Sequence, residues 1–361
     1  MRVRLGDVCD RGTSNLKQSD ITDTSGEYPV YGASGLIGTV SFYHQKLPYV
    51  AVVKDGAGIG RTTLHPAESS VIGTMQYLLP KANILPEYLY YVVKHMHLEK
   101  YYTGATIPHI YFKDYKSEEF NLEPLEKQHI IVDMLEKIES VIEARQKELK
   151  RLDDLIKSRF IEMFGIINEE VPLSYYIASL NAGKSLASEE ESTNKVLKTG
   201  AVTYDYFDAT QTKNLPRDYE PQENHRVNAG DVIISRMNTA ELVGAAAYVW
   251  NVPEHIYLPD RLWKAEIKGT ANPIFLWQVL IQSSTKENIR RIASGTSGSM
   301  KNISKLGLIE IRVVKAPIEL QNQFAAFVQQ VDKSKLLEWI NLAKKSFDLL
   351  HERICNGRHF I

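Results

Sequence analysis

A loop with three glycines follows a β-branched run and has the composition of a phosphate-binding loop. Residues 51–63 read AVVKDGAGIGRTT, and the glycines are Gly56, Gly58 and Gly60. Such a loop can hold a nucleotide or S-adenosylmethionine when a helix begins directly after it, because the first N–H groups of the helix then bind the anion. Here the chain continues as RTTLHPAESSVIG, which is extended and β-branched. The segment therefore does not predict a phosphate site.

Other motifs of catalysis are incomplete or missing from the sequence. Asn272-Pro273-Ile274-Phe275 resembles the Asp/Asn-Pro-Pro-aromatic motif of DNA methyltransferases, but it lacks the second proline and opens a helical pattern, FLWQVLI. The chain contains no GxxxxGK[ST] motif, no HExxH motif and no Cys/His spacing typical of a metal site. We therefore expect no catalytic residue, no metal ligand and no cofactor bound by this chain.

Loops that combine glycine with basic, amide and hydroxyl residues recur at the ends of β-branched runs. These side chains pair with base edges and phosphates, and glycine lets the backbone approach a ligand closely. For any single loop, a solvated turn explains the composition equally well. The candidate DNA-contacting residues are Tyr31, Ser34, Lys54, Arg61, Thr62, Thr106 and His109 in the first half of the chain, and Lys184, Ser185, Arg236, Asn238, Lys301 and Asn302 in the second.

The bulk composition is that of a globular protein with room for two domains. The chain has 361 residues, of which 43% are hydrophobic and 24% charged, and its formal net charge is −1. This charge argues against a protein that coats nucleic acid, but it permits recognition through local basic loops. No apolar run has the length of a membrane span or a signal peptide, and Cys9 and Cys355 form no disulfide framework. We expect a cytoplasmic protein with no membrane partner.

The sequence repeats itself. PLEKQ begins at residue 124 and PIELQ at residue 317, 193 residues further on, and each opens a long helix-prone segment. Four upstream stretches also match: TGATIPHI (103–110) with SGTSGSMKNI (294–303), LPEYLYYVV (85–93) with NPIFLWQVL (272–280), PYVAVVKDGAG (48–58) with GDVIISRMNTA (230–240), and LGDVCDRGTS (5–14) with YIASLNAGKS (176–185). These matches predict two copies of one element, each a mixed globular part followed by a long helix, related by a pseudo-twofold axis.

The first long helix is predicted from Pro124 to Phe164, ahead of Gly165. Proline suits the first turn of a helix, and glycine suits its C-terminal end. The steps between its apolar positions alternate between three and four residues, which predicts a narrow seam against one partner helix. The seam residues are Ile131, Leu135, Ile138, Ile142, Arg145, Leu149, Leu152 and Ile156.

The second long helix is predicted as one continuous element from Pro317 to Cys355. Its seam is Leu336, Ile340, Ala343, Phe347, Leu350 and Ile354, whereas Phe324, Val328 and Val331 are out of phase and suggest a stutter. Two such helices in one chain are expected to pair antiparallel and to act as a spacer. In that arrangement Arg145 either meets Glu338 within the seam or extends to solvent.

The predicted fold class is α+β, with two mixed α/β domains separated by two long antiparallel coiled-coil helices. The predicted boundaries are 1–122 for the first domain, 123–165 for the central helix, 166–315 for the second domain, and 316–361 for the C-terminal helix.

The chain resembles the specificity subunit of a type I restriction–modification system over nearly its whole length. The stretches that carry the resemblance are YPVYGASGLIG (28–38), TGATIPHIYFKDYKSEEFNLEPLEKQ (103–128) and KAPIELQNQF (315–324). The resemblance implies that 1–122 and 166–315 are target-recognition domains, each reading one half of a split double-stranded DNA target. It places Lys54 and Arg61 near phosphate or guanine. Because the two copies differ in their loops, the target is expected to be asymmetric.

The same resemblance implies the partners. The paired helices are expected to set the spacer and to bind two modification (methyltransferase) subunits, which use S-adenosylmethionine and perform the chemistry. Restriction (helicase-nuclease) subunits can then join, and the chain itself is expected to have no catalytic activity. Two alternatives stay open. One is the recognition subunit of a type IIB-like system, and the other is a two-headed coiled-coil adaptor that binds proteins and no DNA, which the near-zero net charge favours.

Overall fold

The computed structural model describes residues 1–21, 26–56, 58–104, 108–295, 300–331 and 334–356. Within the last helix, the side chains of 334–338, 351 and 353–356 are outside this description. The predicted site residues Thr106, Leu336 and Glu338 therefore lie outside the described residues or side chains. The chain divides into two compact units: the first comprises residues 1–148 and the C-terminal helix from Ser334, and the second comprises residues 149–333.

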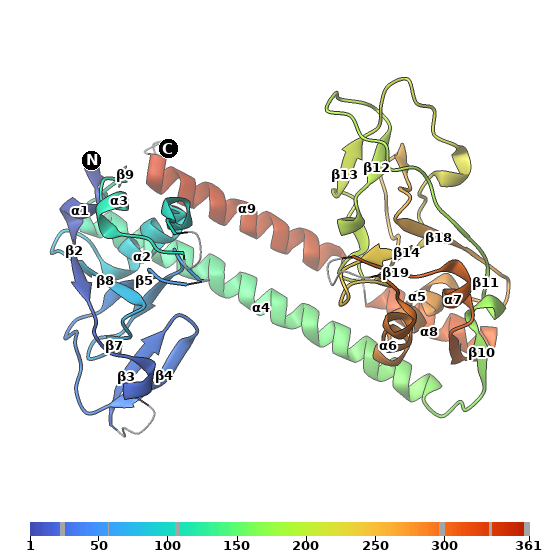
Figure 1. Cartoon of the computed structure of the whole chain (residues 1–361), viewed down its shortest axis with the longest axis horizontal. Coiled ribbons are helices and arrows are strands. Elements are labelled where there is room, and N and C mark those ends of the chain that lie inside the picture. Colours follow the sequence, from blue (N-terminus) through green and yellow to red (C-terminus); the bar gives the residue numbers. More distant parts are fainter. Residues whose placement is uncertain (22–25, 57, 105–107, 296–299, 332–333, 357–361) are drawn as a thin grey trace. The chain divides into compact units, whose positions relative to one another are not determined.

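The first unit is built on a four-stranded antiparallel sheet and a smaller three-stranded sheet (Figure 1). The large sheet has the order β2 (Cys9–Thr13), β8 (Met75–Pro80), β5 (Tyr49–Val53), β6 (Thr62–His65). The small sheet has the order β4 (Gly35–Val40), β3 (Tyr28–Gly32), β7 (Ser70–Val71), and β1 (Arg2–Arg4) pairs with β9 (Glu119–Asn121). The helices are α1 (Leu5–Val8), α2 (Pro86–His95) and α3 (Phe112–Tyr115), with 3-10 turns at Gln18–Asp20 and Leu98–Tyr101.

Strand β5 is packed on both of its faces, because the residues on each face are apolar. All five residues of YVAVV are buried. Val50 and Val52 pack into the core that helix α2 covers, whereas Tyr49, Ala51 and Val53 pack into a second cluster with Tyr77 and Met75. A strand that is buried on both faces gives the loop that follows it a fixed starting point.

The second unit has the same kinds of sheet. Its large sheet has the order β11 (Ile177–Asn181), β18 (Leu262–Ile267), β14 (Val232–Ser235), β16 (Ala246–Tyr248), and its small sheet has the order β13 (Thr212–Asn214), β12 (Lys195–Leu197), β17 (Ile256–Tyr257). Strand β10 (Glu170–Pro172) pairs with β20 (Arg312–Val314), and β15 (Met237–Asn238) pairs with β19 (Lys301–Asn302). The helices are α5 (Pro273–Ile281), α6 (Ser283–Ile292) and α7 (Lys305–Ile309), with 3-10 turns at Leu173–Tyr175, Thr199–Val202 and Glu223–His225.

The large sheet, the small sheet and the pair β1–β9 or β10–β20 match between the two units, which confirms the internal repeat and the α+β class. Where the second unit has the pair β15–β19, the first has an isolated bridge between Asp55 and His109. In both small sheets the middle strand has one antiparallel and one parallel neighbour. One predicted match needs correction. The sequence match aligned Cys9 with Leu180. In the structure Cys9 is equivalent to Ile177, because Cys9 pairs with Pro80 at the end of β8 and Ile177 pairs with Ile267 at the end of β18. The true offset differs by three residues, because the first apolar residues of both copies lie in a short helical turn ahead of the strand.

Helix α4 (Leu125–Phe164) is one continuous helix of 40 residues, about 60 Å long. It ends where the sequence predicts, with the N–H of Gly165 donating to the Ile161 carbonyl at 2.8 Å. The predicted seam is its least exposed stripe. Ile131 and Leu135 are buried in the core of the first unit, and Ile156 in that of the second. The other apolar seam residues, Ile138, Ile142, Leu149 and Leu152, are half-buried.

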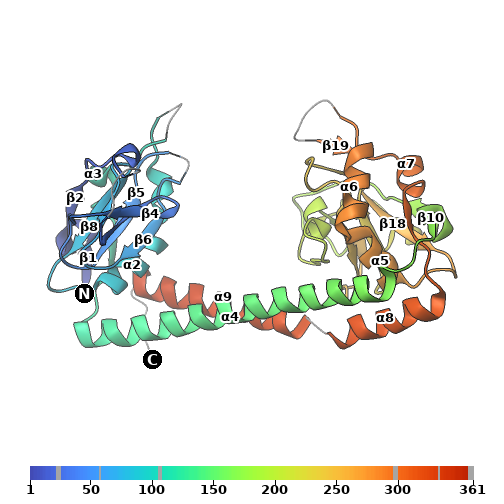
Figure 2. The same ribbon diagram turned by 90° about the horizontal axis from the view of Figure 1, so that it is seen from below.

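Within the first unit, α9 (Ser334–Asn356) runs antiparallel to α4, as predicted (Figure 2). The Arg145 guanidinium lies over the Trp339 ring at 5.7 Å, and further along α9 Phe347 packs on the core that holds Leu135. Ile340 is buried. Arg145 is exposed and pairs with Glu148 at 2.6 Å on its own helix, while its meeting with Glu338 stays a prediction.

The prediction of one continuous second helix is wrong. Helix α8 (Ile318–Gln330) ends before Val331, whose φ of −80° and ψ of 57° are not helical, and α9 begins at Ser334. Phe324 and Val328 belong to the core of the second unit, whereas Phe347 packs on the first. One straight helix cannot present the apolar stripe of α8 and that of α9 to their two cores at once, because the stripes are out of phase. The helix is therefore interrupted between Gln330 and Ser334, near the position where the sequence suggested a stutter.

Candidate nucleic-acid interface

In the first unit, the loop after β5 and the segment 103–109 are tied together. The N–H of Ile110 donates to the Lys54 carbonyl at 2.9 Å, and the N–H of Gly56 donates to the Pro108 carbonyl at 3.0 Å. His109 Nδ1 lies 2.6 Å from the Asp55 carboxylate. The two predicted residues Lys54 and His109 therefore come together, with Asp55 between them.

The other end of the same loop reaches the turn between β3 and β4. Exposed Arg61 donates from its guanidinium to the Ala33 carbonyl at 2.8 Å, which places it beside Ser34. Tyr31 is half-buried, with its ring 4.4 Å from the imidazole of His65. Tyr31, Ser34 and Arg61 thus form a second group of predicted residues.

Thr62 is the predicted residue of this unit that the structure places least favourably for contact with a ligand. It is buried, and its hydroxyl donates to the Gly60 carbonyl at 3.2 Å. Its side chain serves the turn into β6. The pattern RTT placed it at a loop end but did not say on which side of the strand it points.

The glycines of the loop after β5 serve backbone geometry. Gly56 and Gly60 have φ values of 92° and 80°, which other residues rarely adopt. A Cβ at Gly60 would lie 2.6 Å from the Glu99 nitrogen. Strand β6 begins at Thr62 directly after the loop, so no helix N-terminus is present there to bind a phosphate.

The NPIF segment is a helix start. Asn272 Oδ1 accepts hydrogen bonds from Ile274 N at 2.9 Å and Phe275 N at 3.5 Å, which is the bonding of an N-cap. Its side-chain NH₂ donates to Asn322 Oδ1 at 2.9 Å, and the Phe275 ring is fully buried. Neither side chain is free for catalysis.

In the second unit, Arg236 is at the centre of the predicted residues. The N–H of Ile303 donates to its carbonyl at 3.0 Å, and its Nε donates to Asn302 Oδ1 at 3.4 Å. The pairing of β15 with β19 sets Asn238 opposite Lys301, whose ammonium donates to the Gly295 carbonyl at 2.7 Å. Four predicted residues thus gather at one strand pair.

Lys184 and Ser185 lie on a neighbouring segment. The Ser185 hydroxyl bonds the Asp260 carboxylate and accepts from the Asp260 N–H at 3.2 Å. The Lys184 ammonium lies over the Tyr219 ring at 5.8 Å. The residue after Asp260, Arg261, accepts at its carbonyl from the Arg236 N–H at 3.1 Å, which connects the two segments.

Lys54 and Arg236 occupy the same position in the two copies. The carbonyl of each accepts a hydrogen bond from an isoleucine, Ile110 or Ile303, which directly follows the bridge residue His109 or Asn302. The N–H of each donates to the carbonyl of the residue just before the neighbouring strand, Thr74 or Arg261. The bridge between Thr103 and His109 corresponds to that between Ser294 and Asn302, which confirms the sequence match with its two inserted residues.

Two residues beside these groups were not predicted, Asp55 and Arg261. Asp55 carries the charge that faces His109, and Arg261 adds an exposed basic residue next to Arg236. The sequence could have indicated Arg261, because this basic residue directly precedes the β-rich run LWKAEI of the second copy.

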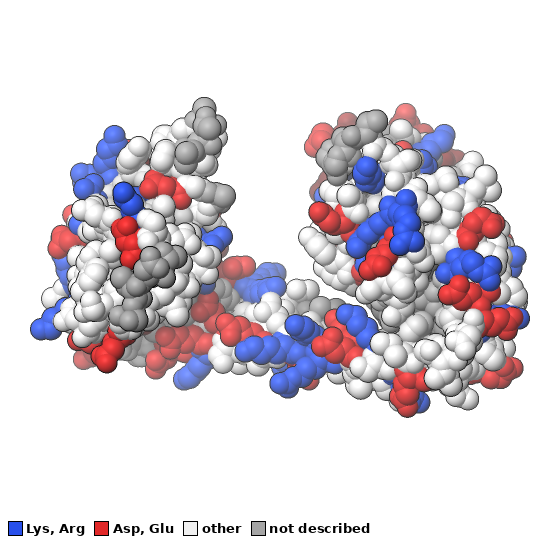
Figure 3. All heavy atoms as spheres, turned by 60° about the horizontal axis from the view of Figure 1, so that its bottom comes forward, with Lys and Arg blue, Asp and Glu red and all other residues white. Residues whose placement is uncertain are grey.

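The electrostatic character of the surface is mixed. Acidic and basic side chains are intermingled over the face drawn in Figure 3, as the net charge of −1 suggests. Among the described residues, no group of three or more His, Cys, Asp or Glu side chains could hold a metal ion. No helix in the described part of the chain combines the length and the apolar character that crossing a membrane requires.

The comparisons with known proteins agree with the fold. Residues 1–153 match the family model of the type I restriction modification DNA specificity domain. The chain is thus similar to specificity subunits of type I restriction–modification systems, through a segment that is less than half of its length.

Two known proteins illustrate this similarity. The chain is similar to the type I restriction enzyme EcoEI specificity subunit of Escherichia coli, with 25% identity over 204 residues, which are 55% of this chain and 34% of the relative. The match therefore spans about a third of that relative's length. The solved structure of a type I restriction–modification S subunit from M. genitalium covers 100% of this chain and 96% of its own, with a TM-score of 0.61 and 16% identity. That likeness supports the fold.

Proposed function

We propose that this chain reads the sequence of a split double-stranded DNA target for a type I modification and restriction enzyme. The observation that carries the proposal is the equivalence of Lys54 and Arg236. A basic residue directly follows the strand β5 or β14 in both copies, and a second segment hydrogen-bonds to the backbone of that residue in both. Arg and Lys at such loop ends bind phosphates and guanine edges.

The differences between the copies support an asymmetric target. Beside Lys54 the first copy has the contact of the His109 imidazole with the Asp55 carboxylate, whereas beside Arg236 the second copy has the amide of Asn302. Donor and acceptor groups of different kinds select different bases in the major groove. We infer that the two half-sites differ in sequence.

The paired helices offer a surface for partners. Besides the seam, α4 exposes Ile130, Met134 and Val141, which lie four and seven residues apart. On α9, Trp339, Leu342 and Leu349 are exposed with a similar spacing. Apolar side chains at these intervals form one face of a helix and suit a helical partner. We infer that two modification subunits dock on the helices, bind S-adenosylmethionine and perform the methylation, and that this chain is not catalytic.

The proposal is tested by purifying the chain with the modification subunit encoded beside it and selecting bound fragments from a random pool of duplex DNA. The expected result is one enriched split motif with two different half-sites, and binding that weakens steeply as salt is raised. A stable complex that enriches no sequence would contradict the proposal.

That outcome would favour the adaptor alternative. The mixed surface charge and the exposed apolar faces of α4 and α9 are what a protein-binding scaffold also requires. The two functions differ in one respect, because an adaptor would retain its protein partners without any sequence-selective binding of DNA.

A further inference from the structure

The connection between the first two strands of the small sheet differs in the two copies. In the first unit, β3 ends at Gly32 and β4 begins at Gly35, so the connection is a turn of two residues. In the second unit, β12 ends at Leu197 and β13 begins at Thr212, so residues 198–211 connect them. An insertion of this kind in one copy is a natural place for a function that the other copy lacks.

The insertion exposes two aromatic side chains. Tyr204 and Tyr206 are 71% and 48% exposed, and their ring centroids lie 6.3 Å apart with an angle of 17° between the planes. Single exposed apolar side chains are common on protein surfaces, but two parallel rings on one loop offer a continuous aromatic surface to a ligand.

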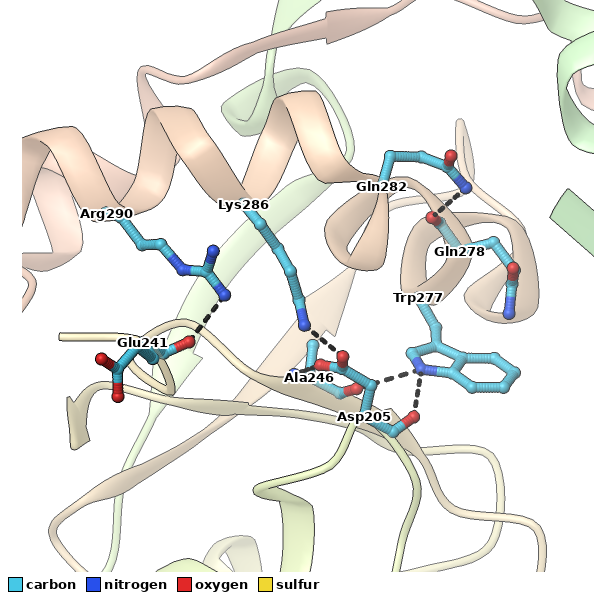
Figure 4. Close-up of polar contacts among 8 residues, drawn as sticks. All are labelled: Asp205, Glu241, Ala246, Trp277, Gln278, Gln282, Lys286 and Arg290. Carbon is cyan, nitrogen blue, oxygen red and sulfur yellow. Dashed lines mark hydrogen bonds and ion pairs between the residues drawn. The ribbon is translucent and has the colours of Figure 1, made fainter. Parts of the chain in front are cut away.

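The residue between the tyrosines is held firmly. Asp205 has a φ of 63°, a left-handed conformation that is unfavourable for most residues. Its carboxylate accepts from the Ala246 N–H at 3.2 Å and pairs with the ammonium of Lys286 on α6. The Trp277 indole N–H donates to the Asp205 carbonyl at 3.2 Å (Figure 4). These contacts stabilise a strained backbone, so the loop has a defined shape before any ligand arrives.

The insertion also touches the candidate interface. Asn238 donates from its side-chain amide to the Thr203 hydroxyl at 3.5 Å. Asn238 follows Arg236 by two residues and pairs with Lys301 across the strands. The tyrosines therefore belong to a loop that contacts the basic and amide residues assigned to DNA.

We propose that Tyr204 and Tyr206 contact the DNA of the second half-site, with their rings against sugars and base edges in the groove. The inference rests on the proposed function and adds a recognition element that only the second copy contains. Aromatic rings pack on apolar groups such as the thymine methyl, while the nearby Arg236 and Lys301 bind phosphate. Asp205 and Lys286 act as positioning residues, because they hold the loop and do not face the DNA themselves.

The test uses the complex of the chain with its modification subunit and the target selected by the wild-type complex. The double substitution Tyr204→Ala and Tyr206→Ala is expected to weaken binding roughly tenfold to a hundredfold, with loss of footprint protection over the second half-site alone. Tyr204→Phe and Tyr206→Phe are expected to keep the affinity within about threefold, because the rings remain. Leu306→Ala, at the most exposed apolar side chain of α7, is the control.

A second pair of variants separates positioning from folding. Lys286→Met removes the ion pair with Asp205, and Lys315→Met removes a lysine–carboxylate pair with Glu169 on the surface of the same unit. Only Lys286→Met should weaken protection of the second half-site. A photo-cross-linking residue placed at Tyr204 should attach to DNA of that half-site.

The outcomes separate the inference from the proposed function. If the wild-type complex selects no sequence, the proposed function fails. If it selects a split target, but the alanine variants bind within twofold of wild type and residue 204 attaches to no DNA, the tyrosine inference is overturned and the proposed function stands.

Discussion

Gln128 and Gln321 make the same three hydrogen bonds at the starts of α4 and α8. The side-chain oxygen of Gln128 accepts from the N–H of Leu85, and its NH₂ donates to the carbonyls of Asn83 and Glu123. Gln321 accepts from the N–H of Asn272 and donates to the carbonyls of Thr270 and Ala316. Both glutamines are fully buried. Each therefore ties a long helix to the segment that begins α2 or α5 in its own unit.

Replacing either glutamine with leucine should destabilise its unit. Gln128→Leu leaves buried backbone groups without partners, at a cost of about 1–3 kcal/mol for each group that stays buried. Protection of α2 against amide hydrogen exchange should fall in Gln128→Leu, and protection of α5 should fall in Gln321→Leu.

Matched controls are available on the same helices. Gln146 and Gln323 are exposed, so Gln146→Leu and Gln323→Leu change the same atoms at the surface. If these controls lose as much protection as the buried variants, the hydrogen bonds of the buried glutamines do not explain the effect.

The equivalence of Lys54 and Arg236 predicts separable DNA defects. Lys54→Ala should weaken contacts to the first half-site, and Arg236→Ala contacts to the second, each by roughly tenfold in affinity, because each removes a cation at one loop end. Footprinting of the complex on the selected target resolves the two halves. Equal loss of protection at both halves in either variant would argue for a folding defect in place of a local contact.

The length of the helical segment should set the spacer of the target. Seven residues inserted after Glu148 in α4, with seven more after Trp339 in α9, preserve the heptad phase and add about 10 Å. At about 3.4 Å per base pair, the preferred spacer should lengthen by about three base pairs. Selection from random duplexes measures it, and an unchanged spacer in a folded variant would contradict the role of the helices.

The stability of the first unit should depend on pH through His65. Burial lowers the pKa of this imidazole to about 4, so it is neutral in the fold, where its Nε2 lies 2.7 Å from the Thr63 hydroxyl beside the Tyr31 and Tyr49 rings. Unfolding raises its affinity for protons. Its contribution to stability is therefore complete above about pH 6.5 and is lost as the pH falls towards 4, by at most about 1.4 kcal/mol per pH unit.

The comparison of His65→Gln with wild type isolates this contribution. Amide exchange of β6 at pH 7.5 and pH 5 should show a smaller loss of protection in the variant. His129→Gln, at an exposed position of α4, serves as the control. An identical pH dependence in His65→Gln and wild type would show that other groups govern it.

Much of the fold followed from periodicity and repetition in the sequence. The heptad steps identified α4 and its seam, because a strict alternation of three and four residues is typical of a helix that packs along one partner helix. The match of PLEKQ with PIELQ located two equivalent glutamines, although their buried hydrogen bonds could not be foreseen from the letters. The break after Gln330 was missed because a change of phase predicts a stutter and an interruption equally well.

The candidate site was predictable where the backbone fixes it. Lys54 and Arg236 follow buried strands, so their places at loop ends could be inferred. Thr62 shows the limit, because a residue beside a loop can point inward, and nothing in RTT says which way. The tyrosine loop was missed because no copy of it exists in the first half, so the repeat offered no comparison.

The central claim is that each half of this chain reads its own half of a split DNA target. It is tested most directly by mapping DNA methylation across the host genome in two strains. One expresses the chain with the modification subunit encoded beside it, and the other expresses a chimera in which residues 1–122 come from a known type I specificity subunit. We predict an asymmetric split motif for wild type, and a chimera that changes one half-site and keeps the other. Methylation that changes in both halves, or no methylation with a soluble and assembled complex, would contradict the account.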